Sequence, residues 1–255
     1  MGMSKLWRFT RAAFPDDPTL NYALDHAIAE HVEQEKAPAT VRLWQPGRCL
    51  AIARFDHRLP RFGEAAQFIK KQGIEIVQRM SGGKAVWQDE GYLNFSIIAR
   101  KRSPKISIPE TYGRFSEGLM LGLRVLGVKT EFKHIEGAFC DGPYDLATND
   151  RKLVGTAQVQ KRGFIIVHGT ILVDCDLDAM VKKICEFYER AGQPTPLRKE
   201  AMTTVAAEMR QSLSMEQVID ALFEGYQQSL GRLQEEELLS SEWERARTLR
   251  SEIAI

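Results

Sequence analysis

The sequence predicts an α+β fold with a mixed or largely antiparallel sheet. Segments with helical spacing of apolar residues and strand-like segments are mixed along the chain rather than strictly alternating, which argues against a regular βαβ repeat. Several strand-like runs follow one another through short turns rich in Gly, Asn and Pro, a pattern typical of antiparallel pairs. No internal repeat, low-complexity segment or interdomain linker is visible in the 255 residues, so we expect a single domain over 1–255.

In the N-terminal half, a short alternation of apolar and polar residues predicts an edge strand over 7–14. Asp16-Asp17-Pro18 is typical of a helix start, and the helical spacing of apolar residues continues to about Glu35. The segments 40–44 and 49–55 flank a turn of Gln, Pro, Gly and Arg, and we expect them to pair as a hairpin. A helix from about Arg58 to Gly73 and strands over 74–78 and 92–100 are expected next.

In the C-terminal half, helical spacing predicts a helix over 110–126, and Gly127 is its stop signal. Asn149-Asp150 is a tight-turn signal between strand-like runs. Asp176 is a good N-cap for a further helix, and Ser214 and Gln217 form a capping box. The C-terminal helices therefore begin at about residue 214, and the remaining expected elements are strands over 128–135, 153–159 and 164–173 and a final charged helix over 233–249.

Composition and charge argue against several classes of protein. The formal net charge is +1, so no basic field favours a nucleic-acid or membrane partner. No run approaches the roughly 20 apolar residues of a membrane helix. The four cysteines form no C-x-x-C pair and no zinc spacing, so no metal is expected; without a secretory leader they are interpreted as reduced thiols of a cytoplasmic protein. Cys49 and Cys185 are interpreted as packing residues within a strand and a helix.

Cys140 is the first candidate for a reacting group. It lies in a loop between Gly137 and Pro143, and loops held by a rigid scaffold often carry reacting side chains. If the turn at Asn149-Asp150 forms a hairpin, Lys152 returns towards the level of this loop. A nearby ammonium favours a thiolate and can donate to a developing oxyanion. The local features leave the alternative open, because most lone cysteines are buried packing residues.

A second informative stretch is 80–96, where Ser81-Gly82-Gly83 directly follows a predicted strand. Glycines allow backbone amides to approach a ligand, and a run of such amides can bind an oxygen anion. The alternative is a simple sharp turn. Asp89 and Asn94 bracket the polar linker to the next strand, and both can pin a loop through hydrogen bonds to the backbone.

Two other features have an ordinary interpretation beside a functional one. His168 lies in a predicted strand between Val167 and Gly169, where a lone histidine is more often a core residue than a catalyst. The basic loop over 101–109 is more often a solvated surface than a docking site.

In combination, two motifs resemble those of the lipoate-protein ligase and octanoyltransferase family. The run 79–94, RMSGGKAVWQDEGYLN, resembles a signature of an arginine, Ser/Thr-Gly-Gly, Ala-Val, an Asp, a Gly and Leu-Asn. The run 151–158, RKLVGTAQ, resembles the family's lysine strand. Order and spacing fit, and the similarity extends over about 17–210. The resemblance implies a biotin/lipoate protein ligase-like fold, with mixed, largely antiparallel sheets flanked by helices.

Within this family the chain is most similar to the cysteine-dependent acyltransferases, through 139–146, FCDGPYDL, and 56–60, DHRLP. Lys84 and Gln88 stand where the ATP-dependent ligases typically carry a glycine and a histidine. The most similar branch moves octanoyl groups from the glycine cleavage H protein to lipoyl domains of 2-oxoacid dehydrogenases. His168-Gly169 instead resembles the branch that uses octanoyl acyl carrier protein, and Asp141 is not typical of the first branch.

The resemblance implies ping-pong catalysis through a covalent intermediate. Cys140 would attack the carbonyl of the acyl donor, and the lysine of a lipoyl domain would resolve the thioester. Lys152 would stabilise the thiolate and the oxyanion. An apolar tunnel would hold the octanoyl or lipoyl group, and no cofactor would be required. The residues implied in substrate binding are Arg79, Ser81, Gly82, Gly83, Asn94, Gly155, Thr156, Ala157 and His168.

Other functions remain open at this stage. The resemblance leaves two donors open, glycine cleavage H protein and acyl carrier protein, with lipoyl domains as acceptor in both cases. An ATP-dependent lipoate-protein ligase would need Lys152 but not Cys140. A non-catalytic lipoyl-domain binding protein would bind the same domains without becoming acylated. A biotin ligase is less expected, because the basic nucleotide-binding glycine motif of that group is not apparent.

Overall fold

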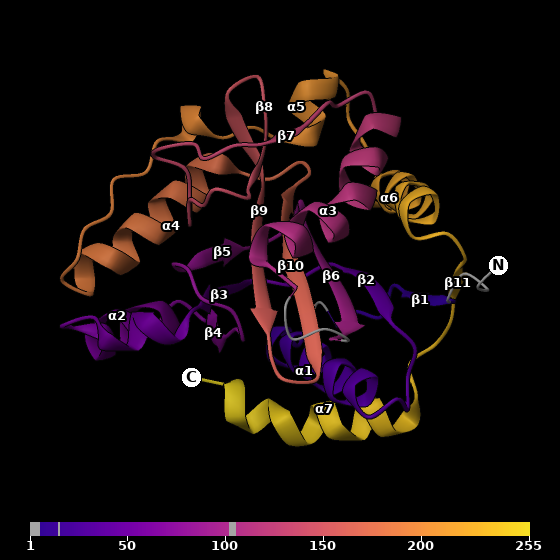
Figure 1. Ribbon diagram of the computed structural model, residues 1–255. Helices are drawn as coiled ribbons and strands as arrows, with labels where there is room; N and C mark the ends of the chain where they lie inside the picture. Colours follow the sequence, from indigo (N-terminus) through magenta and orange to yellow (C-terminus); the bar gives the residue numbers. More distant parts are fainter. Residues whose placement is uncertain (1–5, 15, 102–105) are drawn as a thin grey trace.

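The computed structural model describes residues 6–14, 16–101 and 106–255, and within these the strands form two sheets (Figure 1). The strands of the larger sheet are β1 (Trp7–Thr10), β2 (Thr40–Trp44), β6 (Tyr92–Arg100), β7 (Glu131–Phe132), β8 (Leu146–Thr148), β9 (Arg151–Gln160), β10 (Phe164–Leu172) and β11 (Leu233–Glu235). The smaller sheet contains β3 (Cys49–Ile52), β4 (Glu75–Gln78) and β5 (Val86–Gln88).

The helices are α1 (Pro18–Glu33), α2 (Phe62–Lys70), α3 (Ile108–Val125), α4 (Leu177–Arg190), α5 (Val205–Met209), α6 (Met215–Leu230) and α7 (Ser240–Ile253), with two short 3-10 helices at Arg54–Arg58 and Lys199–Ala201. Capping residues explain where several of these helices begin. Asp17 caps α1 by accepting a hydrogen bond from the Leu20 amide at 2.9 Å. Ser214 and Gln217 form the predicted capping box of α6.

The larger sheet has the order β11-β1-β2-β6-β10-β9-β8-β7, and the smaller has the order β4-β3-β5. From β2 to β7 every neighbouring pair is antiparallel, whereas β1 pairs parallel with both β2 and β11. In the small sheet β3 is parallel to β4 and antiparallel to β5. The prediction of an α+β fold with mixed, largely antiparallel sheets is therefore confirmed.

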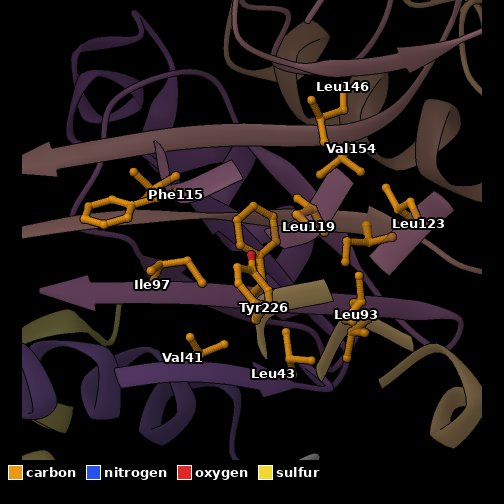
Figure 2. Packing of buried hydrophobic residues seen from close by; sticks show 14 of the residues in the cluster. Val41, Leu43, Leu93, Ile97, Phe115, Leu119, Leu123, Leu146, Val154 and Tyr226 are labelled. Carbon is orange, nitrogen blue, oxygen red and sulfur yellow. The ribbon is translucent and has the colours of Figure 1, made fainter. Parts of the chain in front are cut away.

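Helices cover both faces of the larger sheet. Alternate residues of a strand face opposite sides, and in β6 Leu93 and Ile97 belong to a core with α3 and α6, whereas Ile98 packs with α1. Figure 2 shows the first of these cores, with Leu119 of α3 and Tyr226 of α6 beside the strands. Helix α7 packs on α1, and α2 and α4 pack with the small sheet. Helices therefore pack against both sheets, and the buried cores lie between the helices and the sheets.

Two predicted strand arrangements are wrong. The segments 40–44 and 49–55 do not form a hairpin, because β2 joins the larger sheet and β3 the smaller one. The turn between them is a crossover, since a turn signal sets a change of direction but not the partner of the next strand. The segment 7–14 is not an edge strand either: β1 lies between β2 and β11, and all its residues are buried.

Two element predictions differ in extent or kind, and one strand was not predicted. The final helix predicted over 233–249 starts as strand β11, and α7 begins only at Ser240. The strand predicted over 128–135 is reduced to Glu131–Phe132. Strand β5, within the polar linker, was not predicted. The predicted basic loop over 101–109 falls partly outside the described residues. No helix in 6–14, 16–101 and 106–255 is long and apolar enough to cross a membrane.

Candidate active site

A pocket lined by residues of both sheets lies beside Cys140. Strand β10 and its neighbours form one wall, and the turn after β4 together with β5 forms the opposite one. The lining residues are Tyr22, Trp44, Arg79, Ser81, Val86, Gln88, Asn94, Phe95, Phe139, Cys140, Gly155, Thr156, Ala157, His168, Gly169 and Thr170.

Cys140 is the cysteine that lines this pocket. It lies in the loop between β7 and β8, is half-buried, and has a backbone φ of +39°. Non-glycine residues rarely adopt this left-handed region, and such strain is found preferentially at functional sites. The three other cysteines, at positions 49, 175 and 185, do not line the pocket. Burial raises the pKa of the Cys175 thiol to about 12, so it is held in its neutral form.

Two donors contact the sulfur of Cys140. The Lys84 amide lies 3.1 Å from Sγ, and the Arg79 Nη2 lies 3.5 Å from it. The same Nη2 donates to the carbonyls of Gly82 at 2.9 Å and Lys84 at 2.6 Å, so the guanidinium also holds the turn that presents the amide. Gly83 packs against the sulfur with a φ of +102°. The turn after β4 is thus shaped around the thiol.

The electrostatics of Arg79 agree with this contact. Burial alone would lower its pKa, but the neighbouring Cys140 sulfur, with smaller contributions from Tyr22 and Asp56, raises the pKa above its ordinary value. A guanidinium remains charged in proteins, so Arg79 supplies a fixed positive charge beside the sulfur. Its Nε has no hydrogen-bond partner among the described residues and lies at the pocket.

Lys152 is brought to the Cys140 loop, as the hairpin argument predicted, but its polar contacts are with the loop backbone. Its Nζ donates to the carbonyls of Phe139 at 2.7 Å and Cys140 at 3.2 Å, and pairs with Asp145 Oδ2 at 2.6 Å. The ammonium is fully buried and lies 4.1 Å from the centre of the Phe139 ring. Stabilisation of a thiolate or oxyanion by Lys152 therefore stays a prediction, while its part in holding the loop is visible.

Asp145 is a site residue that the sequence analysis missed. Its carboxylate accepts from the Gly142 amide at 2.8 Å and the Thr156 amide at 2.9 Å, besides its pair with Lys152. Burial raises the pKa of Asp145, although Lys152 opposes this. In the sequence, Asp145 could have been found as a carboxylate seven residues before Lys152, on the other side of the turn between β8 and β9. Asp145 and Lys152 together fix the loop that carries Cys140.

Most of the remaining predicted residues line the pocket. Ser81 and Asn94 line the pocket and are buried, and Asn94 accepts a hydrogen bond from Thr170 at 2.7 Å. Gly82 and Gly83 are not lining residues; a side chain on Gly82 would meet no atom within 4 Å. Gly155, Thr156 and Ala157 line the pocket from β9.

His168 satisfies both interpretations that the sequence left open, because it is buried and also lines the pocket. Burial lowers its pKa to about 4, and its Nε2 has no partner among the described residues. Ser81 Oγ and Gln88 Oε1 are also buried and lack a described partner. The pocket wall therefore combines polar groups with the apolar side chains of Val86, Phe95 and Phe139. An apolar tunnel for the acyl chain stays a prediction.

Comparison with known proteins gives relatives over most of the chain. An octanoyl-GcvH:protein N-octanoyltransferase of Geobacillus kaustophilus is 30% identical over 234 residues, covering 89% of this chain and 83% of the relative. An enzyme of the same name from Kyrpidia tusciae is 31% identical over 78% of this chain and 72% of the relative. The octanoyltransferase LipM of Brevibacillus brevis is 30% identical, covering 84% of this chain and 83% of the relative.

Solved structures with the same fold are lipoate-protein ligases. A lipoate-protein ligase A bound with ATP superposes with a TM-score of 0.77 at 22% identity, covering 96% of this chain and 94% of the other. A bi-partite lipoate protein ligase of Thermoplasma acidophilum, studied with its E2 lipoyl domain, gives 0.73 at 21% identity over 97% and 92% of the two chains. A model of the lipoyl protein ligase A/B catalytic domain matches residues 17–227, and the chain belongs to this family.

Proposed function

We propose that this protein is an acyltransferase of protein lipoylation that carries the acyl group as a thioester on Cys140. The donor is octanoylated glycine cleavage H protein, and the acceptor is a lysine of a lipoyl domain. The observation that supports this most directly is the position of Cys140 Sγ at the pocket, within 3.1 Å of the Lys84 amide and 3.5 Å of the Arg79 guanidinium.

The surroundings of Cys140 suit a nucleophilic thiol. A thiolate is the reactive form, and a positive charge together with a backbone amide stabilises it. Arg79 is buried, so its charge acts through a medium less polar than water. The Lys84 amide donates to the sulfur, and a donor so close to the sulfur could also stabilise the oxyanion that forms on an acyl group there. Both groups would favour attack on the donor and then stabilise the departing thiolate.

In this mechanism Lys152 acts on the loop rather than through direct contact with sulfur. Its ammonium donates to the carbonyls of Phe139 and Cys140, and Asp145 balances its charge. These contacts hold Cys140 in its left-handed backbone conformation. For a non-glycine residue this conformation is less stable than the right-handed one by roughly 1–2 kcal/mol, so an isolated loop would not keep it. Lys152 thereby keeps the nucleophile in place between donor and acceptor steps.

The pocket offers apolar side chains that an acyl chain on the sulfur would contact. Val86, Phe95 and Phe139 provide apolar wall, and burying about seven methylene-type carbons at about 0.8 kcal/mol each would contribute several kcal/mol to binding. The names of the relatives from Geobacillus kaustophilus and Kyrpidia tusciae support this donor, because both are octanoyl-GcvH transferases. The same proposal includes a preference of the enzyme for octanoyl over lipoyl groups.

Intact-mass spectrometry tests this function. The protein is incubated without ATP with octanoylated H protein or with octanoyl acyl carrier protein. We expect one octanoyl adduct from the H protein, which hydroxylamine removes and which Cys140→Ala lacks. Cys185→Ala is the matched control, since Cys185 lies in α4 and contacts the Thr195 carbonyl, and it should still be acylated. No adduct with either donor, but lipoylation once ATP and lipoate are added, would overturn the proposal in favour of a ligase.

A further inference from the structure

A second polar cluster adjoins Cys140 at the protein surface. Asp141 follows the cysteine in sequence, and its carboxylate contacts two side chains. Oδ2 lies 2.8 Å from His134 Nε2, and Oδ1 lies 3.1 Å from Lys84 Nζ. Lys84 is also the residue whose amide contacts Cys140 Sγ. The imidazole of His134 is thus linked to the thiol loop through Asp141 and to the sulfur-binding turn through Lys84.

The acceptor step requires a group of this kind. A lysine reaches the thioester as an ammonium, and nitrogen can attack only after losing a proton. Arg79 and Lys152 are cations, and the Asp145 carboxylate already accepts three hydrogen bonds. His168 is buried in the acyl pocket, and its pKa of about 4 makes it a weak base. None of these four can receive a proton from a lysine that arrives from solvent.

His134 meets the requirement by position. Its side chain is 52% exposed, so a lysine of another protein can reach it. Nε2 faces Asp141, and no hydrogen bond from a described residue reaches Nδ1. An imidazole held by a carboxylate through one nitrogen, with the other nitrogen free, is the arrangement of a general base in acyl transfer.

We propose that His134 is the general base that deprotonates the acceptor lysine, and that Asp141 is its positioning residue. This inference rests on the thioester at Cys140 proposed above. In this proposal the lysine side chain arrives from solvent at the exposed pair, and the pocket that Cys140 lines holds the acyl chain.

The lysine ammonium gives one proton to His134 Nδ1, and the free nitrogen forms a bond to the thioester carbonyl carbon. The carbon–sulfur bond then breaks, Cys140 leaves with the electron pair, and the sulfur takes the second proton from the attacking nitrogen. The products are an amide and the free thiol, and the imidazolium releases its proton to solvent.

The charges around His134 fit these roles. Burial alone would raise the pKa of Asp141, but hydrogen bonds from His134 and Lys84 lower it below its ordinary value. Asp141 therefore stays ionised, orients the imidazole and stabilises the imidazolium. Lys84 and Asp141 are the charged groups in contact with this site, and Lys133 is engaged by Glu131 and Asp150 on the neighbouring strand and turn.

The experiment separates the two half-reactions. Octanoyl-enzyme is formed first from an octanoyl thioester of a small thiol, because its thiolate leaves without a proton, whereas the lysine that leaves octanoylated H protein would need one from protonated His134. The rate of formation is recorded for wild type, His134→Gln and Asp141→Asn. Each acyl-enzyme is then mixed with saturating lipoyl domain or with hydroxylamine, which is unprotonated at neutral pH and needs no base. His57→Gln is the matched control, because His57 is an exposed histidine in the 3-10 helix Arg54–Arg58.

We expect acylation within about twofold of wild type in every variant, which also shows that each variant is folded. Lysine transfer should fall by about 100-fold in His134→Gln and by at least tenfold in Asp141→Asn, the range that general-base catalysis contributes. Release by hydroxylamine and both reactions of His57→Gln should be unchanged. The role of His134 would be overturned if the rates with lysine and hydroxylamine fell equally, if the rate with lysine did not change, or if acylation were lost. It would also be overturned if only the half-saturating concentration of lipoyl domain changed. Absence of any adduct on wild type would instead sink the thioester function itself.

Discussion

Around Cys140, single atoms decide which residues can be tolerated. The Arg79 guanidinium, the Lys84 amide and the Gly83 backbone surround the sulfur, and a Cβ added to Gly83 would lie 2.5 Å from Sγ and 2.8 Å from Arg79 Nη2. Gly82, one residue earlier, would meet no atom within 4 Å. The Ser-Gly-Gly turn therefore has one glycine that the thiol requires and one that it does not contact.

This contrast predicts different effects for two neighbouring substitutions. Gly83→Ala should lower the rate of Cys140 acylation at least tenfold, because the methyl group displaces the thiol from Arg79, and its φ of +102° should cost about 1–2 kcal/mol of stability. Gly82→Ala should acylate within about threefold of wild type. Single-turnover acylation and thermal unfolding of both variants make the test, and equal rates for the two would contradict the packing argument.

His168 predicts a pH dependence of stability. Its pKa is about 4 in the folded protein, because burial disfavours the charged imidazole, and about 6.5 in the unfolded chain. Between these values the unfolded state binds the extra proton, so the free energy of unfolding falls as the pH falls from about 6.5 and levels off below about 4. From pH 7 to pH 5 the loss from this group is about 2 kcal/mol.

His168→Asn isolates that contribution, since asparagine does not titrate. Urea unfolding of both proteins at pH 7 and pH 5 should show the wild type losing about 2 kcal/mol more than the variant. Burial also lowers the pKa of His26, and this loss occurs in both proteins and cancels in the difference. Equal losses in the two proteins would mean that His168 becomes charged within the fold.

At the level of elements, α3 and α6 approach closely through glycines. Gly225 of α6 faces Gly118 and Gly122 of α3, and an added Cβ would lie 2.2 Å from the Gly122 amide nitrogen and 2.3 Å from the Gly118 carbonyl oxygen. Both obstacles are backbone atoms, which cannot move without shifting a helix. This contact allows the two helices to cover one face of the large sheet together (Figures 1 and 2).

Two glycine substitutions in these helices should therefore have opposite signs. Gly225→Ala should lower the free energy of unfolding by about 1–3 kcal/mol through overpacking. Gly113→Ala, in an exposed position of α3 where an added Cβ meets no atom within 4 Å, should raise it by up to about 1 kcal/mol through helix propensity. Chemical denaturation measures both, and a stabilising Gly225→Ala would show that the helices can move apart at little cost.

At the scale of the whole molecule, an ion pair joins the first strand to the last helix. Arg8 of β1 makes two hydrogen bonds to Glu242 of α7, at 2.7 and 2.6 Å, and both side chains are almost fully buried. Arg8 also donates to Thr40 of β2 at 3.1 Å. Together with the parallel pairing of β1 and β11, this contact closes the chain at the β11-β1 end of the larger sheet, whereas the Cys140 loop joins β7 and β8 at the other end.

Removing one partner of the Arg8–Glu242 ion pair should strongly lower the stability of the protein. Glu242→Gln should lower the free energy of unfolding by about 3–5 kcal/mol, because it leaves a buried guanidinium without its counter-charge. Arg245→Gln is the matched control on the same helix: its pair with Glu30 is more than one third exposed on both sides and should cost less than about 1 kcal/mol. Because the pair lies away from Cys140, acylation by folded Glu242→Gln at low temperature should equal that of wild type.

The sequence located elements by local signals, and many of these were right. Asp17, Ser214 and the Asn149-Asp150 turn predicted element ends because caps and tight turns depend on a few neighbouring residues. Pairing between distant strands leaves no such trace. The neighbours of β1, and the separation of β2 from β3 into different sheets, depend on contacts between segments far apart in the chain.

For the candidate site, the sequence by itself determined the fold class, the two motif stretches and their main residues, Cys140, Arg79 and Lys152. Only the tertiary structure decided which group contacts which. It places Arg79 and the Lys84 amide at the sulfur, pairs Lys152 with Asp145, and sets His134 beside Asp141. The physical reason is that side-chain contacts of a few ångströms are fixed by the packing of two sheets and a strained loop, whereas motif spacing specifies only which segments carry the reacting groups.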